Sequence, residues 1–391
     1  MSSVAISPSP EEELCLESLP AEILLQIMEE MTPSALSDFA LSCKRFFNIF
    51  IGHKDPLMAT VLKGLPEFNT MLYLFTADKD ELHPDRMLHP RVIDFNTGSD
   101  IINFMQPDAA SNLAEVPQIM LDPGDVVELW NLVTIVDWWV ELYPRLRWRE
   151  LPLDRRCLRA KEEVRLRKAI ARWWLFAHFH HGFSYYYRSF QQPNKWSTDT
   201  RLQHIRSMST GEICELGDLW EVLKDTVSKD LCSSPERVCL CQSPDGVDLV
   251  PWGADDGHRH QTIVNTYMKL APDQLKYFLT VYTGWQKGMA AKAISKCTRD
   301  FRRDTETLSV SINKVLQERM TVKELPTTSS IPRFGIVDED RASDQDIAEW
   351  VDDAWLDGKV PLTESQIVVL PRDASLIVTR GDDGTDDAYP S

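Results

Sequence analysis

Residues 16–50 read LESLPAEILLQIMEEMTPSALSDFALSCKRFFNIF, and this stretch decides how the N-terminal part of the chain folds. Pro20 stands where a first helical residue is expected, and Glu22 follows near the positive end of that helix. Apolar side chains then recur at helical spacing, at Ile23, Leu24, Ile27, Met28 and Met31. The pattern predicts a short helix with one apolar face.

Two further short helices follow in the same stretch. Thr32 and Pro33 have the form of an N-cap followed by a proline in the first turn. A second apolar face comes next, and the segment 43–50 supplies a third element that Gly52 is suited to end. The stretch therefore predicts three consecutive short helices.

The same residues resemble the F-box family. That family's pattern is Leu-Pro-x-Glu-Ile/Leu-Leu, an Ile and a Leu or Met at helical steps, a Leu-containing second helix, and Cys-Lys or Cys-Arg with aromatics. The matching positions are Leu19, Pro20, Glu22, Ile23, Leu24, Ile27, Met31, Leu36, Leu41, Cys43, Lys44, Phe46 and Ile49. They span about a tenth of the chain. Residues 208–220 also resemble the helical regions that follow the box in fungal F-box proteins. The alternative is an ordinary amphipathic helical hairpin.

The resemblance implies that the stretch binds the Skp adaptor, which links to a cullin scaffold and a RING subunit. A three-helix unit of about 45 residues is too small to bury its own apolar surface well, so some apolar residues remain for a partner. The positions that the resemblance assigns to adaptor contact are Leu19, Pro20, Ile23, Leu24, Ile27, Leu36, Leu41 and Cys43. Some of them must belong to the internal core instead, and the sequence does not sort them.

Composition favours a mainly α fold with an irregular helical domain after the F-box. The chain has 391 residues, 12 of them Trp, and only 16 Gly, which argues against an all-β fold. Its length leaves room for about two domains. We expect a disordered N-terminus at 1–13, the F-box at 14–60, a helical substrate-binding domain at 61–320, and an acidic, partly disordered tail at 321–391.

Helical patterns recur along the expected body. After a mixed, proline-rich region at 64–124, a helix is predicted from about 125 until Pro144 ends it. Further helices are predicted at about 156–181, 199–208, 209–230 and 272–298, with a loop at 231–261.

The charge of the chain is acidic overall but uneven. The formal net charge is −18, which argues against a general nucleic-acid binder. Residues 337–391 carry a net −11, whereas residues 144–206 carry a net +10. The basic residues of the second region, which we call the basic stretch, are Arg145, Arg147, Arg149, Arg155, Arg156, Arg159, Lys161, Arg165, Arg167, Lys168 and Arg172. They can serve nucleic-acid binding, form a solvated helix face with neighbouring Glu residues, or meet an acidic partner.

The chain supplies such an acidic partner itself. Residues 346–357 form a short amphipathic pattern, with acidic residues on one face and an apolar face at Ile347, Trp350, Val351, Ala354 and Trp355. We expect this docking helix to lie beside the basic stretch or to bind a partner.

No constellation of residues indicates an enzyme, a metal site or a cofactor. A zinc site from Cys232, Cys239, Cys241, His258 and His260 has the wrong spacing, so a surface loop is favoured. The histidines at 178, 180 and 181 fit cations at a helix end packed with aromatics. No phosphate-binding loop, nucleophile elbow or metalloprotease motif occurs.

The scattered cysteines favour a reduced, intracellular protein, cytoplasmic or nuclear or both, and no stretch is apolar enough to span a membrane. We therefore expect a non-catalytic substrate receptor of a Skp–cullin–F-box ubiquitin ligase that binds the Skp adaptor and an unidentified protein substrate. The alternative is a scaffold that binds the Skp adaptor outside a ligase. An enzyme within residues 64–320 is the third interpretation.

Overall fold

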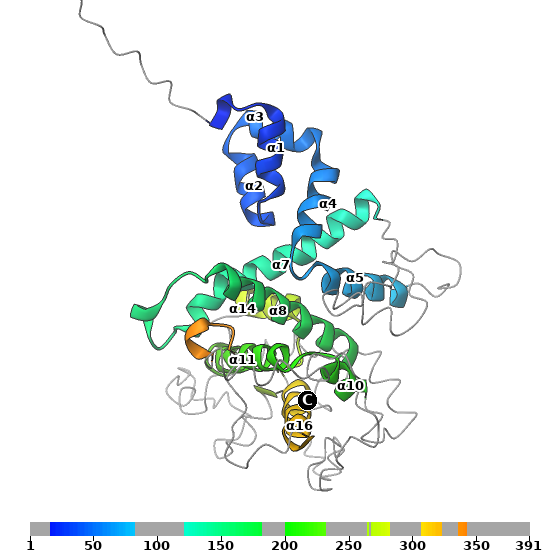
Figure 1. Cartoon of the computed structure of the whole chain (residues 1–391), viewed down its shortest axis with the longest axis vertical. Helices are drawn as coiled ribbons and strands as arrows, with labels where there is room; N and C mark the ends of the chain where they lie inside the picture. The colour runs from blue at the N-terminus through cyan, green and yellow to red at the C-terminus, as the bar shows by residue number, and fades with distance from the viewer. Residues whose placement is uncertain are drawn as a thin grey trace, which may run out of the picture. The chain divides into compact units, whose positions relative to one another are not determined.

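Figure 1 shows the computed structural model of the chain, which describes residues 16–82, 121–181, 200–231, 264–281 apart from 266, 306–322 and 335–341. Eleven α-helices occur within these described residues. The prediction of a mainly α fold is therefore confirmed for this part of the chain. The expected disordered residues 1–13, most of the loop at 231–261 and the docking helix at 346–357 lie outside it.

The chain divides into two compact units. Unit 1 holds Met1–Phe68 and Leu121–Thr134, and unit 2 holds Asn69–Met120 and Ile135–Ser391. The domain boundary expected at residue 60 falls inside a helix, because α4 runs from Lys54 to Gly64 and its Val61 and Leu62 are buried.

Unit 1 begins with short helices that follow one another closely. They are the 3-10 turn η1 (Leu16–Ser18), α1 (Ala21–Glu29), α2 (Pro33–Ser42), α3 (Lys44–Gly52) and α4. Thr32 caps α2, since its Oγ1 accepts a hydrogen bond from Ala35 N at 3.4 Å, and Pro33 fills the first turn. Pro20 is the N-cap residue of α1 and not its first helical residue, because its ψ of 150° is not helical. The helix therefore begins at Ala21, one residue later than expected. The stretch expected to end at residue 60 thus carries a fourth helix beyond the three that the sequence predicts.

The remaining helices lie wholly or partly in unit 2. They are α5 (Phe68–Leu82), α7 (Pro123–Arg147), α8 (Ala160–His180), α10 (Thr200–Arg206), α11 (Thr210–Thr226), α14 (Pro272–Val281) and α16 (Leu308–Val322). Short turns complete the elements, namely η3 (Pro152–Asp154), the π-helical turn η5 (Val227–Leu231) and η6 (Asp338–Asp340). The first part of α7 belongs to unit 1.

The core of unit 2 centres on α8. This helix packs along α11, and the two run side by side in Figure 1. Trp173 of α8 meets Trp139 of α7 edge to face, with ring centroids 5.4 Å apart, and both are 2% exposed. The indole N–H of Trp139 donates to Pro272 O at 3.0 Å, so this buried polar group is satisfied.

The end of α7 and the start of α8 differ from the sequence predictions for local reasons. The helix α7 continues past Pro144 to Arg147, since a proline in the last turn removes only one hydrogen bond. The helix predicted from 156 begins at Ala160, because Arg159 is its N-cap residue and donates its backbone N–H to Glu162 Oε2 at 2.7 Å.

Candidate partner-binding face

The first three helices of unit 1 share a small apolar core. Leu24 and Leu36 are fully buried in it, and the ring of Phe39 stacks on the buried Phe46 with centroids 4.3 Å apart. Leu24 and Leu36 are thus the two expected contact residues that lie in the internal core, where a side chain with no exposed surface holds the unit together.

The other expected contact residues keep some exposed surface. Leu41 is 73% exposed and Ile23 is 41% exposed, while Pro20 is also exposed. Leu19, Ile27 and Cys43 are half-buried. Single exposed apolar residues are common on proteins, so their meaning depends on how many gather in one short stretch.

Three more exposed apolar side chains lie in the same stretch and were not predicted. They are Leu16, Phe47 and Ile51, which are 51%, 41% and 52% exposed. Phe47 and Ile51 stand one turn apart on α3 and so share a face. Residues 46–51 contain five large apolar side chains, more than one helix face can bury, and that excess is the signal that could have indicated them.

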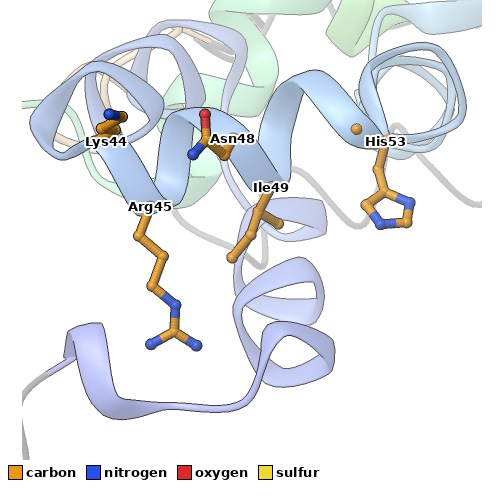
Figure 2. Close-up of a pocket in the computed structure, with 6 residues that line it drawn as sticks. Lys44, Arg45, Asn48, Ile49 and His53 are labelled. Carbon is orange, nitrogen blue, oxygen red and sulfur yellow. The ribbon is translucent and has the colours of Figure 1, made fainter.

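A shallow hollow lies along α3. Figure 2 shows the residues that line it, and its volume is about 520 Å³. Arg45 and Ile49 point in the same direction there, and the Arg45 Nη2 donates to Leu19 O at 2.7 Å. The lining combines cationic and polar groups with one aliphatic side chain, and consists of Lys44, Arg45, Asn48, Ile49, Gly52 and His53. This composition fits a protein surface with acidic and apolar groups.

Cys43 has a structural role in the candidate face. It is the N-cap residue of α3, and its Sγ accepts a hydrogen bond from Phe46 N at 3.5 Å. The thiol therefore helps to fix where α3 begins, and only the rest of its partly exposed surface is open to a partner.

The basic stretch meets acidic residues in unit 2. Arg156, Arg159 and Arg165 form ion pairs with Asp338 and Glu339. The acidic residues belong to the same C-terminal region that carries the net −11. They lie upstream of the expected docking helix, however, whose Ile347, Trp350, Val351 and Trp355 lie outside the described residues.

His180 and His181, at the end of α8, are partly buried and have neutral imidazole rings. His180 Nε2 and His204 Nδ1 lie 3.1 Å apart, and Phe176 packs on the His180 ring at 4.6 Å. Burial lowers the pKa of His180 to about 2, of His181 to about 3 and of His204 to about 4. This corrects the expectation of cationic histidines at the helix end for His180 and His181, while the expected packing against aromatics holds.

Within the described residues, no group of three His, Cys, Asp or Glu side chains could hold a metal ion. The cysteines and histidines weighed for zinc, at 232–260, lie outside those residues. None of the described helices is both long enough and apolar enough to cross a membrane.

No family model matches the chain, and neither a curated protein nor a solved structure shows significant similarity to it.

Proposed function

We propose that this chain is a non-catalytic substrate receptor of a Skp–cullin–F-box ubiquitin ligase. Helices α1–α3 bind the Skp adaptor, and unit 2 binds a protein substrate. The chain carries out no chemistry, since its role is to raise the effective concentration of the substrate near the ubiquitin donor. Such a receptor works in the cytoplasm, the nucleus or both.

The observation that carries the proposal is the division of the F-box-like positions between core and surface. Leu24 and Leu36 close the core of the three helices, while Ile23 and Leu41 present 41% and 73% of their surface. A partner that covers these side chains, together with the exposed Phe47 and Ile51, gains about 25 cal/mol per Å² of apolar surface removed from water. The cationic hollow on α3 fits an acidic rim on that partner.

The test is co-purification of the full chain with the Skp adaptor and a cullin. The variant Ile23→Asp/Leu41→Asp places two charges on the exposed face without disturbing the core, and should lower adaptor binding at least about 100-fold. The matched control is Leu153→Asp in unit 2, because Leu153 is 100% exposed and should leave binding unchanged. Circular dichroism melting checks that all three chains fold.

Each outcome separates the candidate functions. Wild type that carries both adaptor and cullin, with the double variant carrying neither, supports the receptor. Adaptor without cullin supports a scaffold that acts outside a ligase. Wild-type chain that binds no adaptor refutes both and leaves α1–α3 as an ordinary helical unit.

A further inference from the structure

Residues 335–341, with the sequence Gly-Ile-Val-Asp-Glu-Asp-Arg, lie against the other elements of unit 2 as a short bound peptide would. We call them the clasp segment. We call Arg147, Arg156, Arg159 and Arg165 the arginine surface. All of these residues belong to unit 2.

The arginine surface binds every acidic side chain of the clasp segment. Arg159 donates to Asp338 at 3.0 Å and to Glu339 at 3.1 Å. Arg156 donates to Glu339 at 2.6 Å. Arg165 pairs with Asp338, and Arg147 pairs with Asp340. Four planar guanidinium groups close together are suited to bind consecutive carboxylates.

Arg156 of the arginine surface is also held by a residue outside the clasp segment. Glu162 is buried and accepts both terminal nitrogens of Arg156, at 2.7 and 2.6 Å. Burial opposes the charge on Glu162, but hydrogen bonds from Arg156 and from the backbone N–H groups of Arg159 and Asp338 lower its pKa to about 2. Glu162 is therefore ionised at neutral pH and orients Arg156 toward the segment.

The residues around the arginine surface also bind the backbone of the clasp segment and bury its apolar side chains. Ile336 and Val337 are buried, at 0% and 2% exposed. The backbone N–H of Ile336 donates to Asp218 at 2.9 Å, and its carbonyl accepts from Arg165 Nε at 2.8 Å. An aliphatic pair held by such backbone hydrogen bonds is a common way for a protein to bind a linear peptide.

The clasp segment is closed into a loop, which adds a shape requirement. Arg341 Nη1 donates to Gly335 O at 3.1 Å and to Glu215 Oε1 at 3.0 Å. A Cβ atom on Gly335 would lie 2.7 Å from the Cβ of Asp340, which is too close for any other residue without a shift. Glycine is therefore part of the pattern that fits this surface.

The acidic contacts remain near solvent and so can be exchanged. Arg159 and Glu339 are 56% and 54% exposed, and Asp338 is 35% exposed. Ion pairs this exposed contribute little to stability and are screened by salt. Because the segment belongs to the same chain as the arginine surface, its effective concentration there is high, and a partner's segment would have to compete with it.

We propose that the arginine surface and the adjoining apolar site form a receptor for linear protein segments of the pattern Gly–aliphatic–aliphatic–acidic–acidic–acidic, and that residues 335–341 are its resident occupant. The partner is a second protein that carries such a segment. Identifying that partner as a ligase substrate rests on the function proposed above, whereas binding of the segment does not.

The test uses the full chain and a synthetic peptide of residues 333–343, titrated by isothermal calorimetry at low salt. In the variant Asp338→Lys/Glu339→Lys/Asp340→Lys, the resident segment is repelled, so the peptide should bind at least about tenfold more tightly than to wild type. Adding Arg156→Glu/Arg159→Glu should weaken binding about tenfold or more. A control peptide with Gly335→Ala should also bind at least about tenfold more weakly.

The results can also overturn the proposal. Peptide that binds wild type and the triple variant equally, or that is indifferent to reversal of the arginines, refutes a receptor surface. If the triple variant fails to fold by circular dichroism, Glu339→Lys replaces it, because this side chain is 54% exposed. That variant should bind the peptide about two- to fivefold more tightly than wild type, and no gain refutes the proposal. The assay contains no adaptor. A failure of the segment-binding proposal can therefore be distinguished from a failure of the ligase proposal.

Discussion

At the scale of single residues, charged side chains deep in unit 2 are held by partners. Arg167 of α8 is 4% exposed and pairs with Asp137 of α7, which is also buried. Its Nε donates to Glu163 Oε1 at 2.9 Å, one helical turn away. Both charges have lost most of their hydration, so each depends on the other to remain in the core.

Removing one member of this pair should therefore cost more than removing both. Arg167→Met should lower the free energy of unfolding by about 3 kcal/mol, since it leaves a carboxylate buried without its guanidinium. The double variant Arg167→Met/Asp137→Leu should recover at least half of that loss. Urea denaturation measures all three chains, with Arg155→Met as an exposed control. A double variant less stable than the single one would contradict this account.

The buried histidines make the stability of unit 2 depend on pH. The histidine pKa in an unfolded chain is about 6.5, whereas burial lowers the pKa of His181 to about 3 in the fold. The unfolded state therefore binds more protons at this site between about pH 3 and pH 6.5. The contribution of neutral His181 is fully present above pH 6.5 and is lost as the pH falls through this window.

His181→Gln should reduce that acid sensitivity. A glutamine oxygen can replace Nε2 as the acceptor for Thr307 N, which lies 3.3 Å from it, but glutamine does not titrate. Between pH 6 and pH 4, the slope of the unfolding free energy should decrease by up to about 1.4 kcal/mol per pH unit relative to wild type. Urea melts at several pH values measure the slope, and identical slopes for the two chains would disprove the assignment.

At the scale of helices, the starts are encoded in nearby residues. In α11, Ser209 Oγ accepts from Glu212 N at 3.3 Å, and the Glu212 carboxylate accepts from Ser209 N at 2.9 Å. This reciprocal pair is a capping box, which satisfies two N–H groups that the helix itself leaves open. The sequence Ser-Thr-Gly-Glu was therefore sufficient to predict where α11 begins.

Loss of the cap should lower the stability of unit 2. Ser209→Ala should lower the free energy of unfolding by about 1 kcal/mol, because the N–H of Glu212 loses its acceptor. Ser209→Thr keeps a hydroxyl in that place and should stay within about 0.5 kcal/mol of wild type. Thermal melts followed by circular dichroism compare the three chains, and equal loss in both variants would rule out the cap as the cause.

The helices also show which parts of the fold could be predicted from the sequence. Helix type and helix starts depend on local periodicity and caps, so the three helices of residues 16–50 and the start of α11 were predicted. Which of Ile23 and Leu24 lies on the surface and which in the core depends on distant residues that pack on α1. The sequence did not predict this division. The contact of Asp338–Asp340 with the basic stretch joins residues more than 170 positions apart. The charge pattern indicated which two regions could meet, but not which residues pair.

At the scale of the whole molecule, the division into units does not follow the F-box-like stretch. Unit 1 extends to Phe68 and also takes in Leu121–Thr134. Val61, Leu62 and Phe68 are 2%, 0% and 5% exposed, although all three lie beyond residue 60. The F-box-like sequence is thus only part of the unit that folds around it.

A fragment cut at residue 60 should therefore fold less well than one cut at residue 68. The shorter fragment, 1–60, loses three buried apolar side chains, each worth about 1.5–3 kcal/mol when fully buried. We expect 1–68 to be helical with a measurable melting transition, and 1–60 to show weaker helicity and none. Circular dichroism of both fragments decides, and equal melting temperatures would mean that unit 1 ends before α4 is complete.

The tryptophans of the chain are distributed very unequally between its units. Among the tryptophans of the described residues, Trp130 alone belongs to unit 1, whereas the edge-to-face pair Trp139 and Trp173 lies deep in unit 2. The ultraviolet emission of the described tryptophans therefore comes mostly from unit 2. A thermal ramp followed by the emission wavelength therefore reports mainly the loss of that core, and α1–α3 can unfold while the spectrum hardly changes.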